Sequence, residues 1–161
     1  MIRNLRNSDA VSVLEIYRQG LDTGEASFET EAPDWQSWQG KYLPHSRLVW
    51  EQDGQLRGWA ALAPVSDRDC YRGVAEVSVY VATDLVGQGI GNKLMAALIE
   101  ESERNGIWSL YSSIFPENQA TLKLHLRHGF REVGIRERIA QRDGRWRNTL
   151  ILERRSDKVG V

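Results

Sequence analysis

The sequence predicts an α/β fold in which helices cover the faces of one mixed, mostly antiparallel sheet. Stretches in which apolar and polar residues alternate, as in strands, are interspersed with stretches in which apolar residues recur every three or four positions, as in helices. Asp-Gly pairs at 53–54 and 143–144 separate neighbouring strand-like stretches and favour antiparallel hairpins. The 161 residues, 41% apolar and 27% charged, suit a single domain over 1–161 with its core at 2–153.

The first part of the chain provides strands and two short helices. In order, we expect a strand at 2–5, a helix after the capping residues 7–9, a helix opened by Pro33-Asp34, and strands at 47–51 and 55–63. The segment 19–40 contains five acidic residues and no Lys or Arg. Two interpretations remain open for this segment: a solvated acidic loop, or a rim that attracts a cationic amine.

A strand and a helix at the centre of the chain organise the remainder. The strand alternates Val77, Val79 and Val81 with Glu76, Ser78 and Tyr80, and the helix runs from Ile90 to Arg104 with apolar residues about every four positions. We then expect a helix end at Asn105-Gly106, a strand at 107–115, a helix at 116–128, strands at 130–140 and 145–152, and a short tail at 157–161.

The turn between the central strand and helix reads Val86-Gly87-Gln88-Gly89-Ile90-Gly91. Glycines at alternate positions leave main-chain N–H groups bare at the positive end of a helix dipole, and this arrangement favours phosphate binding. The third glycine comes one residue too early for a dinucleotide fold, and Gly91-Asn92-Lys93 lacks the Gly-Lys-Ser/Thr of a P-loop. We therefore expect a different phosphate site, formed by Val86, Gly87, Gln88, Gly89, Ile90, Gly91, Asn92 and Lys93.

Composition argues against several partners. The net charge of −1 and the lack of a basic stripe argue against nucleic acid, and no apolar run reaches membrane-spanning length. Cys70 is the single cysteine, so we expect no internal disulfide and a reducing, cytoplasmic compartment. No metal-ligand spacing is recognisable, and we expect no metal. Nine arginines lie beyond residue 126, which indicates either a solvated strand face or a docking surface for an anion.

Two stretches resemble a known family, the GNAT acyl-CoA N-acetyltransferases. The glycine turn resembles the family motif Arg/Gln-x-x-Gly-x-Gly/Ala, with Val86 where Arg or Gln is usual. The stretch 118–130 resembles the late GNAT signature, in which Asn118 would meet the CoA arm and His125, in place of the usual Tyr, would face its sulfur. Together with 28–31 and 68–76, it is similar to the phosphinothricin and methionine sulfoximine acetyltransferase group. The resemblance covers 2–153 and implies a GNAT fold, acetyl-CoA as cosubstrate and a homodimer.

Acetyl transfer to an amine requires a base, a donor for the thioester oxygen and an acid for the thiolate. Glu76 is the candidate base, because a carboxylate at the start of an apolar strand is expected to face a wet cleft. The alternative is a structural ion pair with Arg68 or Arg72. A main-chain N–H among Val77, Ser78 and Val79 would hold the oxygen. His125 or Tyr80 would return a proton to sulfur.

An amino-acid-like acceptor carries a carboxylate, and Arg68 or Arg72 beside Tyr71 would bind it. Phe28 would form a wall of the same site. Solvated loop charges and a core Phe are the alternatives. The sequence thus predicts an acetyl-CoA-dependent N-acetyltransferase for a small amino-acid-like amine such as phosphinothricin, methionine sulfoximine or methionine sulfone. Two other possibilities stay open: acetylation of another amine such as a protein N-terminus, and a non-catalytic module that binds acetyl-CoA.

Overall fold

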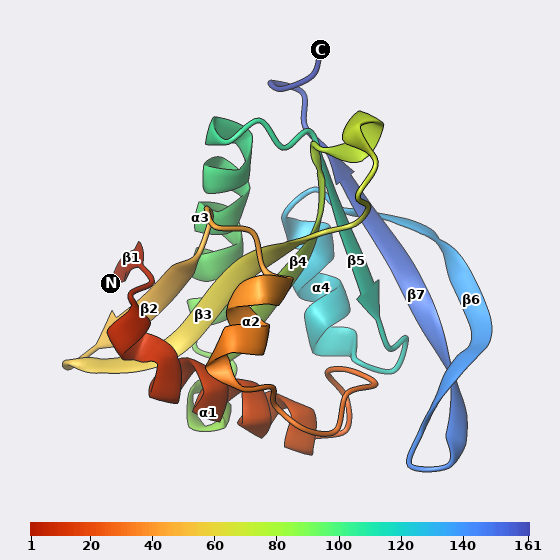
Figure 1. Ribbon diagram of the computed structural model, residues 1–161. Coiled ribbons are helices and arrows are strands. Elements are labelled where there is room, and N and C mark those ends of the chain that lie inside the picture. The colour runs from red at the N-terminus through yellow and green to blue at the C-terminus, as the bar shows by residue number, and fades with distance from the viewer.

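The molecule is built on a seven-stranded sheet with strand order β1-β2-β3-β4-β5-β7-β6, and the computed structural model describes all of residues 1–161 (Figure 1). The strands are β1 (Ile2–Asn4), β2 (Leu48–Gln52), β3 (Gln55–Pro64), β4 (Val74–Val81), β5 (Ser109–Ile114), β6 (Arg131–Arg142) and β7 (Arg145–Arg155). Neighbouring strands are antiparallel except for β4 and β5, which are parallel. The predicted mixed, mostly antiparallel sheet is therefore confirmed.

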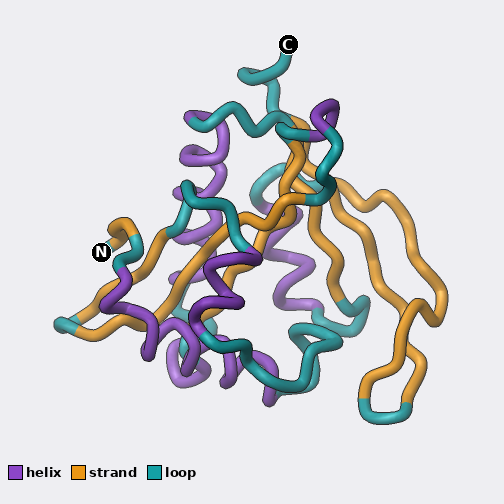
Figure 2. The backbone as a smooth tube through the Cα atoms, viewed as in Figure 1, coloured by secondary structure: helices purple, strands orange, loops and turns teal.

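Helices cover both faces of this sheet, and each face has its own apolar core (Figure 2). The helices are α1 (Ala10–Asp22), α2 (Trp35–Lys41), α3 (Ile90–Arg104) and α4 (Gln119–Arg127). On the α3 side, Val77 of β4 packs with Leu94. On the α1 and α2 side, Tyr17 packs with Trp59, and Tyr80 of β4 joins them. The alternation of β4 is thus explained, because its valines and its polar residues face different layers.

One predicted boundary differs for a clear physical reason. The fourth helix begins at Gln119 rather than at residue 116, because Asn118 is its N-cap and accepts a hydrogen bond from the Thr121 N–H at 3.2 Å. Pro116 and the residue after it lie before the cap, outside the helix. The asparagine expected to meet a cofactor therefore also fixes the start of α4.

The sheet splits between β4 and β5. Pairing between these strands covers three residues of each and ends at Glu76 opposite Tyr111. Beyond this point β4 stays paired with β3 as far as Val81, and β5 stays paired with β7 as far as Ile114. Figure 1 shows β4 and β5 separating, with α4 visible between them. Glu76 therefore stands where the two halves of the sheet part.

Candidate active site

Main-chain N–H groups of β4 face the split beside β5. Successive N–H groups of a strand point to opposite sides. The Ala82 N–H donates toward β3, and the Gly73 carbonyl accepts from the start of β5. Odd-numbered residues of β4 therefore face β5. The N–H groups of Val79 and Val81 point to that side, where no strand pairs with them.

The N–H groups of Val77, Ser78 and Val79 were predicted as possible donors to a thioester oxygen. The alternation along β4 gives these three groups different directions. Val77 follows directly on the last β4–β5 pair, and the Ser78 N–H points toward β3. Val79 is the first residue whose N–H is open to the split. The Ser78 side chain lies on the other face, where its Oγ is 3.2 Å from the Tyr42 hydroxyl.

The glycine turn has the conformation that its sequence demands. Gly87 and Gly89 have φ of +88° and +83°, in the left-handed region that side chains disfavour. A Cβ on either glycine would meet no atom within 4 Å, so the main chain here borders open space. The first helical bond runs from the Lys93 N–H to the Gly89 carbonyl, which leaves the preceding N–H groups of α3 without helical partners. Val86 and Gln88 are exposed beside them.

The other predicted residues of the turn have mixed roles. Ile90 is buried in the core, and Gly91 lies inside α3, where a Cβ would make only ordinary contact with Leu124 of α4 at 3.7 Å. The Asn92 amide oxygen is 3.2 Å from Nε2 of His128 at the end of α4. The Lys93 ammonium lies 4.9 Å over an indole ring of β2. The anion-binding capacity of the turn therefore resides mainly in its main chain.

Glu76 is half-buried and its carboxylate has no partner. It forms no hydrogen bond or ion pair, and neither Arg68 nor Arg72 reaches it. The alternative of a structural ion pair is therefore wrong. Burial raises the pKa of Glu76; the Lys41 ammonium lowers it and the Glu29 carboxylate raises it. An unpaired carboxylate with a raised pKa, close to charged neighbours, is a suitable proton acceptor.

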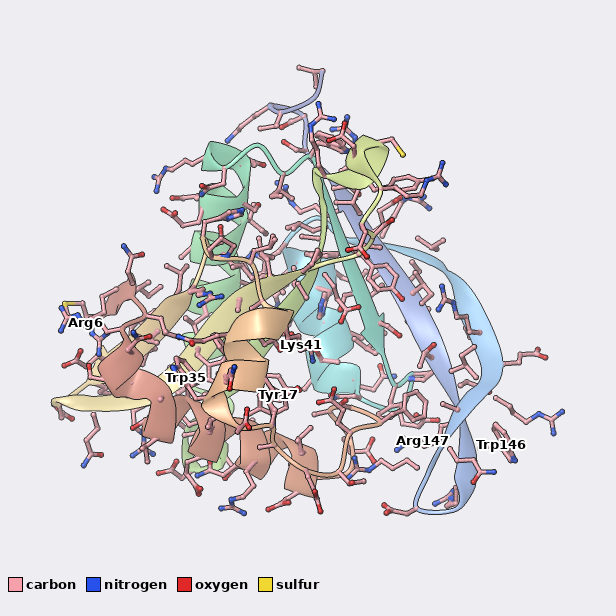
Figure 3. All side chains as sticks on the ribbon, viewed as in Figure 1. Arg6, Tyr17, Trp35, Lys41, Trp146 and Arg147 are labelled. Carbon is pink, nitrogen blue, oxygen red and sulfur yellow. The ribbon has the colours of Figure 1, made fainter.

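Three side chains that the sequence did not single out as site residues gather on the same side as Glu76. We call Tyr17, Glu29 and Lys41 the Lys41 cluster; Figure 3 labels Tyr17 and Lys41 beside α2. The Tyr17 hydroxyl donates to Glu29 Oε2 at 2.6 Å and lies 3.2 Å from Lys41 Nζ. Lys41 Nζ is 3.5 Å from Glu29 Oε1. One feature of the sequence could have indicated this cluster: Lys41 is the first cationic residue after the acidic segment 19–40.

Tyr80 is held in an aromatic stack two positions beyond Ser78. Its ring lies 4.9 Å from that of Tyr17 and 5.0 Å from that of Trp59, both in stacked geometry. A Cβ on Gly20 would come within 2.6 Å of the Tyr80 ring, so this glycine leaves room for the tyrosine. Burial, then nearby phenol and carboxylate groups, raise the pKa of Tyr80. The raised pKa keeps the hydroxyl protonated. The hydroxyl has no protein partner and is not fully buried, so its proton is available for donation.

His125 is buried inside the α4 layer. Its Nδ1 is 2.7 Å from the Thr121 carbonyl oxygen, so Nδ1 carries the proton that this bond requires. Nε2 is buried without a partner, and the ring packs edge-on against Phe130. Burial lowers the pKa of His125. The ring is therefore neutral, and its single N–H proton is already donated to Thr121, so it has no proton to return to a thiolate.

The acidic segment is held against the β6–β7 arm by two arginines. Arg142, buried at the end of β6, donates to the carbonyl oxygens of Leu21, Ser27 and Glu29 at 2.8, 2.8 and 2.5 Å. Arg147, labelled in Figure 3, donates to the Gly24 carbonyl at 2.9 Å. The arginine-rich end of the chain therefore includes structural clamps, a role that neither sequence interpretation included.

The clamp also connects the acidic segment to the start of α4. Arg147 pairs with Glu117 at 3.2 Å, and its guanidinium lies 3.7 Å over the Phe115 ring. Phe28 packs edge-on against the same ring at 5.0 Å. The Asn118 side-chain amide donates to the carbonyl of residue 25 at 3.2 Å. Phe28, predicted to line the acceptor site, and Asn118, predicted to meet the cofactor, thus belong to one connected region.

The predicted acceptor residues Arg68, Tyr71 and Arg72 lie apart from the Lys41 cluster. They occupy the exposed loop and short 3₁₀ turn before β4. Arg68 lies over the Tyr71 ring, and Arg72 pairs with Asp69 at 3.4 Å. Their role in acceptor binding stays a prediction.

None of the helices combines the length and the apolar character needed to cross a membrane. No group of three or more His, Cys, Asp or Glu side chains is placed to hold a metal ion.

Several characterised proteins are similar in sequence. A phosphinothricin N-acetyltransferase of Alcaligenes faecalis is 35% identical, over 95% of this chain and 81% of that protein. An L-methionine sulfoximine/L-methionine sulfone acetyltransferase of Pseudomonas aeruginosa is 27% identical, over 94% of this chain and 92% of that protein. The similarity to this group that the motifs indicated is confirmed.

Solved structures share the fold over almost the full length. A ribosomal-protein-alanine N-acetyltransferase of Brucella melitensis superposes with a TM-score of 0.89 at 30% identity, covering 97% of this chain and 99% of that one. The yncA protein of Salmonella typhimurium, solved with its cofactor acetyl-CoA, has a TM-score of 0.90 at 26% identity and covers 100% of this chain and 96% of that one. The model of the Acetyltransferase (GNAT) family matches residues 11–130, so the chain belongs to this family of acetyltransferases.

Proposed function

We propose that this N-acetyltransferase transfers the acetyl group of acetyl-CoA to the amine of a small amino-acid-like acceptor, of the phosphinothricin, methionine sulfoximine or methionine sulfone type. One observation carries the proposal: the unpartnered Glu76 carboxylate stands where β4 leaves β5, beside main-chain N–H groups open to the split. This arrangement would supply a base and an oxyanion donor from one strand. The names of the relatives from Alcaligenes and Pseudomonas support the acceptor class.

The residues present fit acetyl-CoA, which supplies an activated acetyl group. The glycine turn offers unpaired N–H groups at the start of α3, next to open space, where a pyrophosphate would bind. The Val79 and Val81 N–H groups would bind polar groups of the pantetheine arm and the thioester oxygen. Asn118 lies at the N-terminus of α4, on the other side of the split.

Glu76 would take the proton from the acceptor ammonium, directly or through water. An amine becomes a nucleophile only after it loses that proton, and the raised pKa of Glu76 brings the carboxylate closer to the basicity required. Tyr80 is the better candidate for returning a proton to the thiolate. Its raised pKa keeps the hydroxyl protonated, whereas His125 presents a bare, buried Nε2. We therefore assign the acid role to Tyr80 and a packing role to His125.

We also propose a homodimer that forms through the β6–β7 arm. This arm ends the sheet, and four of its large apolar side chains are about half exposed: Val133, Ile135, Ile139 and Trp146. Figure 3 shows Trp146 pointing away from the body of the molecule. Sedimentation equilibrium should give twice the chain mass, and Trp146→Glu should shift it toward the monomer; a monomeric wild type contradicts the proposal. The expectation of a cytoplasmic location rests on the single exposed Cys70.

The test of the proposed function is release of free thiol from acetyl-CoA with a panel of amines. The panel contains methionine sulfone, methionine sulfoximine, phosphinothricin, polyamines and short peptides. Release with the amino-acid analogues supports the proposal. Release only with peptides would favour the second candidate, a protein amino terminus, which the 30% identity to the Brucella ribosomal-protein-alanine enzyme suggests. Binding of acetyl-CoA without release with any amine would indicate a non-catalytic module.

A further inference from the structure

Lys41 is the last residue of α2, and the fold fixes its position near Glu76. Asp34 caps the start of the helix by accepting from the Ser37 N–H at 2.8 Å. At the other end, Tyr42 is buried and its hydroxyl is 3.2 Å from Ser78 Oγ on β4. Ser78 and Glu76 share one face of that strand, roughly 7 Å apart along it. The residue next to Tyr42 is therefore held above the strand face that carries Glu76.

In the Lys41 cluster, Tyr17 is buried, whereas the charged ends of Lys41 and Glu29 both reach solvent. The Tyr17 and Tyr42 residues are 1% and 3% exposed, whereas the Lys41 side chain is 38% exposed. Nζ lies 5.8 Å and 5.3 Å from the centres of these two rings. The aromatic rings thus form a floor, and the charged end of Lys41 stands on it in contact with solvent.

This ammonium retains hydrogen-bonding capacity. An ammonium has three N–H donors. Two acceptors lie within 3.5 Å of it: the Tyr17 oxygen at 3.2 Å, and Glu29 Oε1 at 3.5 Å, the outer limit of a hydrogen bond. The Tyr42 hydroxyl is a third neighbour of the ammonium. Tyr17 uses its own proton to donate to Glu29. Only the contact with Tyr17 is a hydrogen bond of ordinary length, so Lys41 keeps donor capacity for a ligand.

The charges around Lys41 suit a zwitterion. The unpaired Glu76 carboxylate would attract the ammonium of an acceptor, and Lys41 would attract an anionic group on the same molecule. The two arginines near the acidic segment already bind groups of the protein. Arg142 donates to three carbonyl oxygens, and Arg147 is bound to Gly24 and Glu117. Among these cations, Lys41 is therefore the one that can still donate hydrogen bonds to a ligand.

We propose that Lys41 binds the carboxylate of the acceptor and so selects amino acids over simple amines. The inference rests on the proposed acetyl transfer and replaces Arg68 and Arg72 as the residues expected to hold the carboxylate. Those two arginines lie in the exposed loop before β4 and make no contact with the Lys41 cluster. The ligand group is a carboxylate within reach of the amine that Glu76 deprotonates.

The experiment compares methionine sulfone with its carboxamide, which keeps the amine and removes the negative charge. Values of kcat/KM for both acceptors are measured by thiol release for wild type and Lys41→Met, a change that keeps most of the apolar stem over the aromatic floor. Lys158→Met removes a charge from an exposed lysine in the tail and serves as the matched control. Arg68→Met and Arg72→Met test the competing assignment. Lys41→Gln provides a second variant if Lys41→Met folds poorly.

For Lys41→Met, kcat/KM for methionine sulfone should fall by roughly 10- to 100-fold, as expected when a charged hydrogen-bond partner is lost. Activity with the carboxamide should stay within about twofold of wild type, so the preference for the carboxylate collapses. An equal fall with both acceptors would overturn the inference, as would an unchanged preference or a collapse caused by Arg68→Met or Arg72→Met instead. A wild type that does not prefer the carboxylate also overturns it. Absence of thiol release by the wild type with every amine would instead refute the proposed function itself.

Discussion

Replacement of Glu76 by Gln tests the assignment of the general base. The substitution is isosteric, and the carboxylate forms no hydrogen bond that the amide would break. A positioned general base contributes about 10²- to 10⁴-fold to a rate. Glu76→Gln should therefore lower kcat by about that factor, which corresponds to roughly 3 to 5 kcal/mol in activation free energy.

The same variant has a stability signature with a definite sign. Burial raises the pKa of Glu76 in the folded state above its unfolded value, so the folded state binds the proton more tightly. Stability contributed by the protonated group is present below the unfolded pKa and is lost as the pH rises through the folded pKa. Gln cannot ionise, so the Tm of Glu76→Gln relative to wild type should increase from acidic to neutral pH.

Three measurements on purified protein check this prediction. Thiol release gives kcat and its pH profile, calorimetry gives the affinity for CoA, and thermal melts at several pH values give the stability difference. We expect a large loss of kcat, loss of the acidic limb of the profile, and CoA affinity close to wild type. Wild-type turnover with an unchanged acidic limb would refute the role of Glu76. Loss of CoA affinity together with turnover would indicate a disturbed cofactor site instead.

The remaining predictions concern the residues around this base. The Lys41 ammonium lowers the pKa of Glu76, so Lys41→Met should raise that pKa and move the acidic limb of the kcat/KM profile to higher pH. An unmoved limb would show that Lys41 does not influence the ionisation of Glu76. Arg142→Met should lower stability by about 2 to 4 kcal/mol and raise KM for the acceptor more than for acetyl-CoA, because three carbonyl oxygens of the acidic segment lose a charged donor. Arg145→Met, in the exposed hairpin, should change neither property. His125→Ala should lower stability by about 2 kcal/mol while kcat stays within about threefold of wild type, and a much larger loss of kcat would assign His125 to the chemistry.

The fold and the glycine turn were predictable because local sequence determines them. The alternation in β4 follows from the two-residue period of a strand. In the structure, its two faces pack into the two different apolar cores on opposite sides of the sheet. The left-handed backbone at Gly87 and Gly89 was predictable because glycine is the residue that adopts this conformation readily. The start of α4 was misplaced because Pro116 suggested a first turn, whereas the Asn118 side chain supplies the cap.

The Lys41 cluster was not predictable in the same way. Tyr17, Glu29 and Lys41 come from α1, a loop and α2, and the tertiary packing of α1 and α2 on the sheet brings them together. Likewise, Arg142 reaches carbonyl groups more than a hundred residues away, so its pattern in the sequence resembled a solvated strand. The direction of the Val79 amide depends on strand pairing, which side-chain periodicity does not report.

Acetyl transfer and acceptor selection both require CoA to bind at the split sheet and the glycine turn. An isothermal titration of the purified chain with CoA should show saturable binding with one site per chain. In Gly89→Val, a β-branched residue at φ of +83° would distort the turn, and binding should weaken by at least roughly 10-fold while the melting transition remains cooperative. No heat and no thermal shift with the wild type, or unchanged binding by a folded Gly89→Val, would contradict the account.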